Sequence, residues 1–129
     1  MTENGVIVDT SVLIGFFKDT EGVAGAVEDL LQQGRVVITG IVLAELLQGM
    51  KNLREELLLD DFLLAVSTLE LTTGIWLKAG RLALALRRKG ITLPLTDVAI
   101  AALAIEHDLP VFTLDKHFKE IPEVRLYTA

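Results

Sequence analysis

The sequence predicts an α/β fold with a central, mostly parallel sheet of four to five short strands flanked by helices. Short apolar runs such as Val6–Val8 are continuous rather than alternating, which is typical of strands buried on both faces of a parallel sheet. Longer segments with apolar residues at helical spacing, such as Val23–Gln33, separate these runs. This alternation of strands and helices favours a sheet that helices cover.

The chain length predicts one domain, covering residues 1–129. With 129 residues, of which 51% are hydrophobic, the chain can bury a sizeable core but has no room for a second domain. The longest apolar run, Val98–Ile105, is far shorter than the ~20 residues of a membrane-spanning helix, and Met1–Gly5 lacks the pattern of a signal peptide. We therefore expect a soluble, cytoplasmic protein.

The element boundaries follow from local sequence. The predicted strands are the short runs Val6–Val8, Val36–Ile38, Ser67–Leu71, Val111–Thr113 and, at the edge, Val124–Tyr127. The predicted helices start at Val12 and then cover Val23–Gln33, Gly40–Gln48, Leu53–Val66, a stretch ending at Lys89, and Thr96–His107. Gly34, Gly49 and Gly90 follow three of these helices, where glycine commonly ends a helix.

Hydroxyl side chains are expected to cap several of these helices, because a hydroxyl oxygen can accept a hydrogen bond from a free N–H group of the first turn. The candidates are Ser11 or Thr10, Thr39, and Thr72 or Thr73. Pro94 prevents a helix from continuing through it, so we expect a new helix to open at Thr96 and Asp97.

Composition limits the chemistry that the chain can perform. The sequence has no cysteine, which excludes disulfides, thiolate metal sites and thiol nucleophiles. The net charge of −6 argues against binding of nucleic acid through overall electrostatic attraction, which requires clustered Lys and Arg. A polyanionic substrate would therefore need a bound metal ion or a local basic patch.

Four acidic residues stand out by their positions. Asp9 and Asp115 each follow a buried strand, Glu45 lies inside an apolar helix, and Asp97 opens one. Open α/β sheets bind ligands at the carboxyl ends of their strands, so the four could converge there. Burial of an unpaired carboxylate costs several kcal/mol, for which a divalent cation such as Mg²⁺ or Mn²⁺ compensates. The pattern therefore predicts metal-assisted phosphodiester hydrolysis.

Each acid also has a structural explanation. Asp97 could stabilise the first turn of its helix, Glu45 could be the solvated residue of a buried helix, and Asp115 could belong to a turn. Asp9 has the weakest alternative, because an acid at a strand end followed by Thr and Ser has no evident structural purpose.

Four motifs in order carry a resemblance to a known family. They are Ile7-Val8-Asp9-Thr10-Ser11, Val42-Leu43-Ala44-Glu45-Leu46 with Gly49, Thr96-Asp97-Val98-Ala99-Ile100-Ala101, and Thr113-Leu114-Asp115-Lys116-His117-Phe118. With these motifs the chain resembles the PIN-domain ribonucleases of the VapC toxin type, over essentially its whole length.

The resemblance implies a PIN-like fold and a Mg²⁺-dependent endoribonuclease, with Mn²⁺ as a possible substitute. It also implies a homodimer that acts on RNA as the toxin of a toxin–antitoxin pair and is held inactive by a VapB-type antitoxin. Carried over by position, the catalytic, metal-binding quartet would be Asp9, Glu45, Asp97 and Asp115. Ser11 and Thr113 match hydroxyl positions that support the quartet, although many relatives have Asn in place of Ser11.

Other candidates have simpler interpretations. His117, in a loop beside Phe118, is interpreted as a packing or hydrogen-bonding group rather than a general base, and His107 as a residue that interacts with a helix C-terminus. Trp76 has apolar neighbours and is expected to anchor the core. One helix carries a basic face, which we interpret as solvated while contact with RNA stays open; it consists of Lys78, Arg81, Arg88 and Lys89.

Two further function classes remain as alternatives. A phosphotransferase of the haloacid dehalogenase type also begins with an Asp at a strand end, but it needs a second Asp two residues later, where this chain has Ser11. A catalytically inactive PIN-like interaction or RNA-binding module would have little need for all four acids. Replacing one acid discriminates, because only an enzyme would lose activity.

Overall fold

The core of the fold is a four-stranded, fully parallel sheet, seen in a computed structural model that describes residues 4–129. Its order is β3-β2-β1-β4. The strands are β1 (Val6–Val8), β2 (Val36–Thr39), β3 (Ser67–Leu69) and β4 (Val111–Phe112). All three residues of β1 are 0% exposed, because β1 lies inside the sheet and helices cover both of its faces. The predicted parallel sheet is confirmed.

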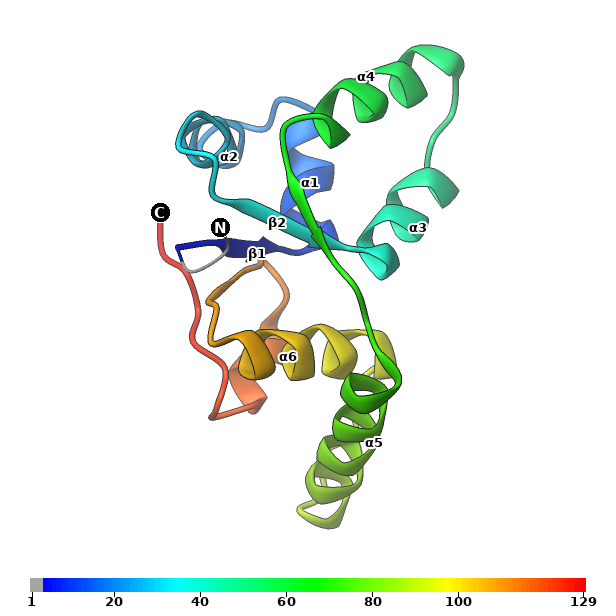
Figure 1. Cartoon of the computed structure of the whole chain (residues 1–129), viewed down its shortest axis with the longest axis vertical. Helices are drawn as coiled ribbons and strands as arrows, with labels where there is room; N and C mark the ends of the chain where they lie inside the picture. The colour runs from blue at the N-terminus through cyan, green and yellow to red at the C-terminus, as the bar shows by residue number, and fades with distance from the viewer. Residues whose placement is uncertain (1–3) are drawn as a thin grey trace.

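Helices form a layer on each side of this sheet. The layer above it in Figure 1 contains α1 (Thr10–Phe17), α2 (Val23–Gln32), α3 (Gly40–Gln48) and α4 (Leu53–Leu63). The layer below contains α5 (Thr73–Arg88) and α6 (Leu95–His107), followed by the short 3₁₀ helix η1 (Lys116–Glu120). The apolar run of α6 is explained by burial, since Val98–Ala104 is buried throughout. No helix within residues 4–129 is long and apolar enough to cross a membrane.

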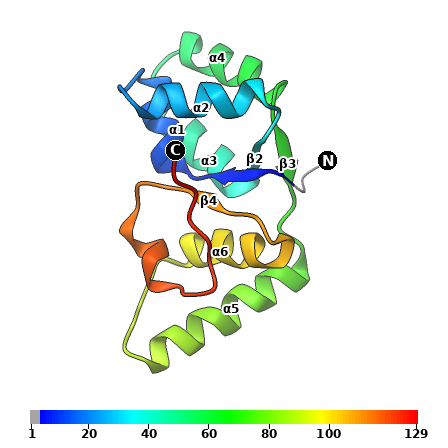
Figure 2. The same ribbon diagram turned by 90° about the vertical axis from the view of Figure 1, so that its left-hand side faces the viewer.

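The predicted edge strand Val124–Tyr127 is wrong. The segment makes a single parallel bridge, between Leu126 and Val111, as it passes beside β4 (Figure 2). Val111 N–H donates to the Arg125 carbonyl at 2.9 Å, and Tyr127 N–H donates to the Val111 carbonyl at 2.8 Å. A longer strand does not form because β4 offers only two residues for pairing. Thr113, which the sequence predicts to be part of β4, lies beyond its end.

The start of α1 also differs from the prediction. Asp9 occupies the N-cap position and α1 begins at Thr10, so neither Thr10 nor Ser11 caps the helix. Their hydroxyl groups instead bond to side chains around the sheet edge. Thr72 caps α5 as expected, by accepting a hydrogen bond from Ile75 N–H at 3.3 Å.

Trp76 is not the core anchor that its neighbours suggested. Ile75 and Ala79 form the buried stripe of α5 together with Leu86, whereas Trp76 is 41% exposed. The reason is helical geometry, because residues three or four apart share a face and adjacent residues do not.

Candidate metal centre

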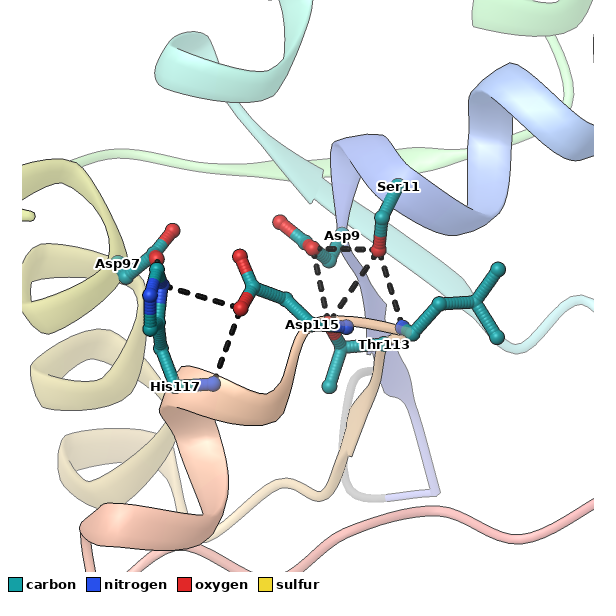
Figure 3. Close-up of polar contacts among 7 residues, drawn as sticks. Asp9, Ser11, Asp97, Thr113, Asp115 and His117 are labelled. Atoms are coloured by element: carbon teal, nitrogen blue, oxygen red, sulfur yellow. Dashed lines mark hydrogen bonds and ion pairs between the residues drawn. The ribbon is translucent and has the colours of Figure 1, made fainter.

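Asp9 lies where the carboxyl ends of β1 and β4 meet. Val8 pairs with Phe112, so the next residues along the two strands, Asp9 and Thr113, stand side by side. Thr113 Oγ1 donates a hydrogen bond to Asp9 Oδ2 at 2.9 Å, and Ser11 Oγ donates to the same oxygen at 2.8 Å (Figure 3). Asp9 is 4% exposed. Two hydroxyl groups therefore fix the orientation of a buried carboxylate.

The same two hydroxyl groups organise the chain that follows β4. Ser11 Oγ accepts a hydrogen bond from Leu114 N–H at 3.0 Å, and Thr113 Oγ1 accepts one from Asp115 N–H at 2.9 Å. Both Ser11 and Thr113 bond Asp9 through Oδ2. Figure 3 shows the other oxygen of Asp9 on the side of Asp97 and Asp115. The hydroxyl groups thus couple the position of Asp115 to that of Asp9.

Asp97, Asp115 and His117 form a compact group next to Asp9. His117 Nδ1 is 2.7 Å from Asp97 Oδ2 and 3.0 Å from Asp115 Oδ1 (Figure 3). Asp97 comes from the first turn of α6, while Asp115 is the N-cap of η1 and accepts a hydrogen bond from His117 N–H at 2.9 Å. Three segments that are distant in sequence thus meet at this edge of the sheet.

The pKa of Asp97 reflects this crowding. Burial is the largest influence and raises the pKa, while the hydrogen bond with His117 opposes it. The negative charges of Asp115 and then Asp9 raise the pKa further. The pKa of His117 is also raised, mainly by its hydrogen bond to Asp97. Three of the predicted acids therefore lie close enough for their charges to interact.

Glu45 lies beside this group rather than in it. Its side chain on α3 is exposed, and Oε1 accepts a hydrogen bond from Thr10 Oγ1 at 2.6 Å. Thr10 directly follows Asp9, so this bond ties Glu45 to the edge of the site.

Sequence reasoning missed the place of His117. The interpretation as a hydrogen-bonding group is correct, but its partners are the acids of the site. A signal is present in the sequence, because an Asp at the start of a turn commonly accepts a hydrogen bond from the N–H group two residues later. That bond folds His117 back towards Asp115.

The donor set fits a hard divalent cation. Carboxylates converge from Asp9, Asp97 and Asp115, and oxygen ligands of this kind suit Mg²⁺ and Mn²⁺. Continuing the β1–β2 register places Thr39 on the other side of Asp9. Thr39 is 0% exposed, and its Oγ1 has no hydrogen-bond partner within residues 4–129. A buried hydroxyl of this kind is normally satisfied by an ordered water or another polar group.

Comparison with known proteins identifies the family. The family model of the PIN domain matches residues 6–124. The ribonuclease VapC of Rickettsia bellii is 32% identical over 135 residues, which cover 97% of this chain and 96% of the relative. The chain belongs to the PIN-domain family, in its VapC branch. Ribonuclease VapC1 of Methanocaldococcus jannaschii is 27% identical over 96% of this PIN domain and 86% of the relative.

Solved structures agree with this assignment. The DNA-bound VapBC of Salmonella typhimurium contains a chain that superposes on this PIN domain with a TM-score of 0.82 and 25% identity, covering 98% of both chains. VapBC2 of Rickettsia felis, bound to a DNA fragment from its promoter, gives a TM-score of 0.81 at 25% identity and covers 95% of this chain and 96% of the relative. The predicted PIN-like fold is confirmed, and the haloacid dehalogenase alternative has no support.

Proposed function

We propose that this PIN domain is a Mg²⁺-dependent endoribonuclease and the toxin of a toxin–antitoxin pair. The observation that carries the proposal is the convergence of Asp9, Asp97 and Asp115 at the carboxyl edge of the sheet, in a chain related to VapC ribonucleases. A non-catalytic module has no need for two further carboxylates close enough to raise the pKa of Asp97. Mn²⁺ is the expected substitute for Mg²⁺.

Asp9, Asp97 and Asp115 would hold the cation, with Glu45 at the margin of the site. When bound, a divalent cation lowers the pKa of a coordinated water and offsets the charge that develops on the phosphoryl oxygens. The chain itself contributes alignment: Ser11 and Thr113 keep one oxygen of Asp9 occupied, so its second oxygen faces the other acids. Asp9 and Asp97 also lie at the N-terminal ends of α1 and α6, where the helix dipole attracts negative charge.

Glu45 is the acid that we assign to the attacking water. Its carboxylate is exposed to solvent, and the bond from Thr10 holds one oxygen while the other stays available to a water molecule. In this role Glu45 would accept the water's proton as the phosphorus is attacked.

The proposed partner is a VapB-type antitoxin, since the solved relatives are VapBC complexes. An apolar groove of about 200 Å³ runs between α1, α3 and α4, with Glu45 on its wall. Ile14 and Leu58 line it and are 44% and 46% exposed. A partner segment seated there would bury apolar surface and cover the margin of the active site. A homodimer is part of the same proposal.

Cleavage of single-stranded RNA tests the function. The purified protein should cleave with Mg²⁺ or Mn²⁺, stop when EDTA is added, and recover when the metal is restored. Asp9→Asn should remove cleavage while the circular dichroism spectrum stays unchanged, because the substitution keeps the shape and deletes ligand charge. Asp60→Asn, at an exposed position on α4, is the matched control. RNA binding without cleavage under all conditions would establish the inactive module instead.

A further inference from the structure

The nitrogen of His117 stands among oxygen donors. Among residues 4–129, Asp97, Asp115 and His117 form the group of acidic and histidine side chains whose ligand atoms all lie within 4.8 Å of one another. The imidazole points Nδ1 at both carboxylates rather than at solvent (Figure 3). A cation held by these two carboxylates would meet this nitrogen as well.

The distances from His117 Nδ1 to the two carboxylate oxygens agree with a shared cation. Neighbouring ligands of an octahedral ion with bonds of about 2.1 Å lie about 3.0 Å apart. Nδ1 is 2.7 Å from Asp97 Oδ2 and 3.0 Å from Asp115 Oδ1. A proton shared between His117 and an acid would give similar distances, so a measurement has to separate the two roles.

The backbone holds His117 at this place. Its N–H group donates to Asp115 Oδ1, and the next residue, Phe118, is 0% exposed in the core. The side chain of His117 is 45% exposed, so solvent and ions reach it. A side chain that is anchored through the backbone and open to solvent is well suited to bind an ion that arrives with its own water.

We propose that His117 Nδ1 is a ligand of the cation held by Asp97 and Asp115, and that it shifts the metal preference of this chain from Mg²⁺ towards Mn²⁺. The proposal rests on the metal-dependent function proposed above. Mg²⁺ binds oxygen ligands almost exclusively, whereas imidazole nitrogen favours transition metals. Adding the imidazole nitrogen to the oxygen donors therefore raises the affinity of the site more for Mn²⁺ than for Mg²⁺.

The test measures metal binding without RNA. Protein labelled with ¹⁵N-histidine is loaded with Mn²⁺, and pulsed electron paramagnetic resonance detects imidazole nitrogen bound to the ion. We expect the coupling in the unsubstituted protein and in His107→Ala, and its loss in His117→Ala. His107, on the exposed C-terminal turn of α6, is the matched control because it is the other histidine of the chain.

Calorimetry with MnCl₂ and MgCl₂ measures the preference. Loss of a residue that hydrogen-bonds to a metal ligand lowers metal affinity about 10- to 100-fold. Loss of the ligand itself should therefore lower Mn²⁺ affinity about tenfold or more. Mg²⁺ affinity should change by about twofold or less, since Mg²⁺ gains little from nitrogen. His117→Asp should restore binding and move the preference towards Mg²⁺.

Two results would overturn the proposal. One is Mn²⁺ binding to the unsubstituted protein without imidazole coupling, and the other is an equal loss of affinity for both ions in His117→Ala, which is the pattern of a positioning residue. Failure of the proposed function is distinguishable: it would appear as imidazole-coupled Mn²⁺ binding without RNA cleavage.

Discussion

Ser11 and Thr113 are 102 residues apart in sequence, yet their hydroxyl oxygens lie 3.3 Å apart and both bond to Oδ2 of Asp9. This contact joins the start of α1, just after β1, to the residue that follows β4, and fixes the carboxylate between them. Each hydroxyl also accepts a backbone N–H group from the segment that leads to Asp115. The geometry of the acidic cluster therefore depends on two small hydroxyl side chains that are not themselves acidic.

Thr113→Val should weaken both the fold and the activity. The substitution keeps the shape but leaves Asp115 N–H without its partner and Asp9 Oδ2 with the hydrogen bond from Ser11 alone, which should lower the free energy of unfolding by about 1 to 3 kcal/mol. RNA cleavage should slow by about tenfold or more, as for loss of a group that orients a metal ligand. Urea unfolding and cleavage rates are the measurements. Thr68→Val, at an exposed position of β3, is the control, and an equal effect there would remove Thr113 from the site.

Several parts of the fold could be predicted because their causes are local. A continuous apolar run such as Val6–Val8 cannot be exposed, so the strand and its burial follow from sequence. Asp9 and Asp115 come just after such runs in the sequence, which places them at strand ends. The family resemblance linked these acids to Asp97 and Glu45.

Other parts depend on contacts between distant segments. Ser11 looks like a helix cap in isolation, but the arrival of Thr113 gives its hydroxyl better partners. The segment near Leu126 could form a strand only along the residues that β4 offers for pairing, and β4 is short. His117 joins the site because η1 turns towards α6, and no pattern within the loop alone specifies that meeting.

Asp97→Asn should stabilise the metal-free protein near neutral pH. Because the folded pKa of Asp97 is raised, the stability that it contributes is present below the unfolded pKa and lost as pH rises through the folded pKa. Asn carries no charge, so it removes the cost of an ionised carboxylate in this buried, acidic surrounding, and its side-chain oxygen can still accept a hydrogen bond. Melting temperature should rise by about 3 to 6 °C for each kcal/mol relieved, and the further rise on adding Mg²⁺ should shrink.

Asp60→Asn on α4 is the control for this melting experiment, since a net charge of −6 gives any lost acid a small benefit. The exposed acid Asp19 would be a poor control. Its φ of 56° lies in the left-handed region that Asn favours, so Asp19→Asn changes stability through the backbone as well as through charge. Equal shifts for Asp60→Asn and Asp97→Asn, with the Mg²⁺ response intact in both, would contradict an acidic cluster around Asp97.

His117 should make the stability of the metal-free protein depend on pH. The hydrogen bond with Asp97 raises the pKa of His117 above its usual value of about 6.5, so its contribution is complete below the unfolded pKa. It is lost as pH rises through the folded pKa. Melting temperature should therefore fall as pH rises above about 6.5, and less so in His117→Gln. His107→Gln should keep the unsubstituted profile; a flat profile in the unsubstituted protein would contradict the pairing.

Leu58→Glu should separate the partner from the chemistry. The substitution puts a charge into the apolar groove between α1 and α4, so an antitoxin segment seated there would lose apolar contact and desolvate a charge. Growth arrest on expression should persist when the antitoxin is co-expressed, whereas RNA cleavage by the purified variant stays intact. Leu64→Glu is the control, because Leu64 is 88% exposed and does not line the groove. Arrest that persists in a Leu58→Glu, Asp9→Asn double variant would have a cause other than hydrolysis.

Thr39→Val should raise the stability of the metal-free protein. Thr39 Oγ1 is buried at the end of β2 with no hydrogen-bond partner within residues 4–129, and an unsatisfied hydroxyl costs about 1 to 3 kcal/mol. Val keeps the branched shape and suits the extended backbone there, where φ is −133° and ψ is 164°. Thermal unfolding with and without Mg²⁺ gives the answer. Equal stabilisation with and without Mg²⁺ is expected, because Thr39 Oγ1 lies below the surface, where a hydrated ion does not reach it. Destabilisation already in EDTA would mean that a buried water satisfies Thr39, and the argument from an unpaired hydroxyl would fail.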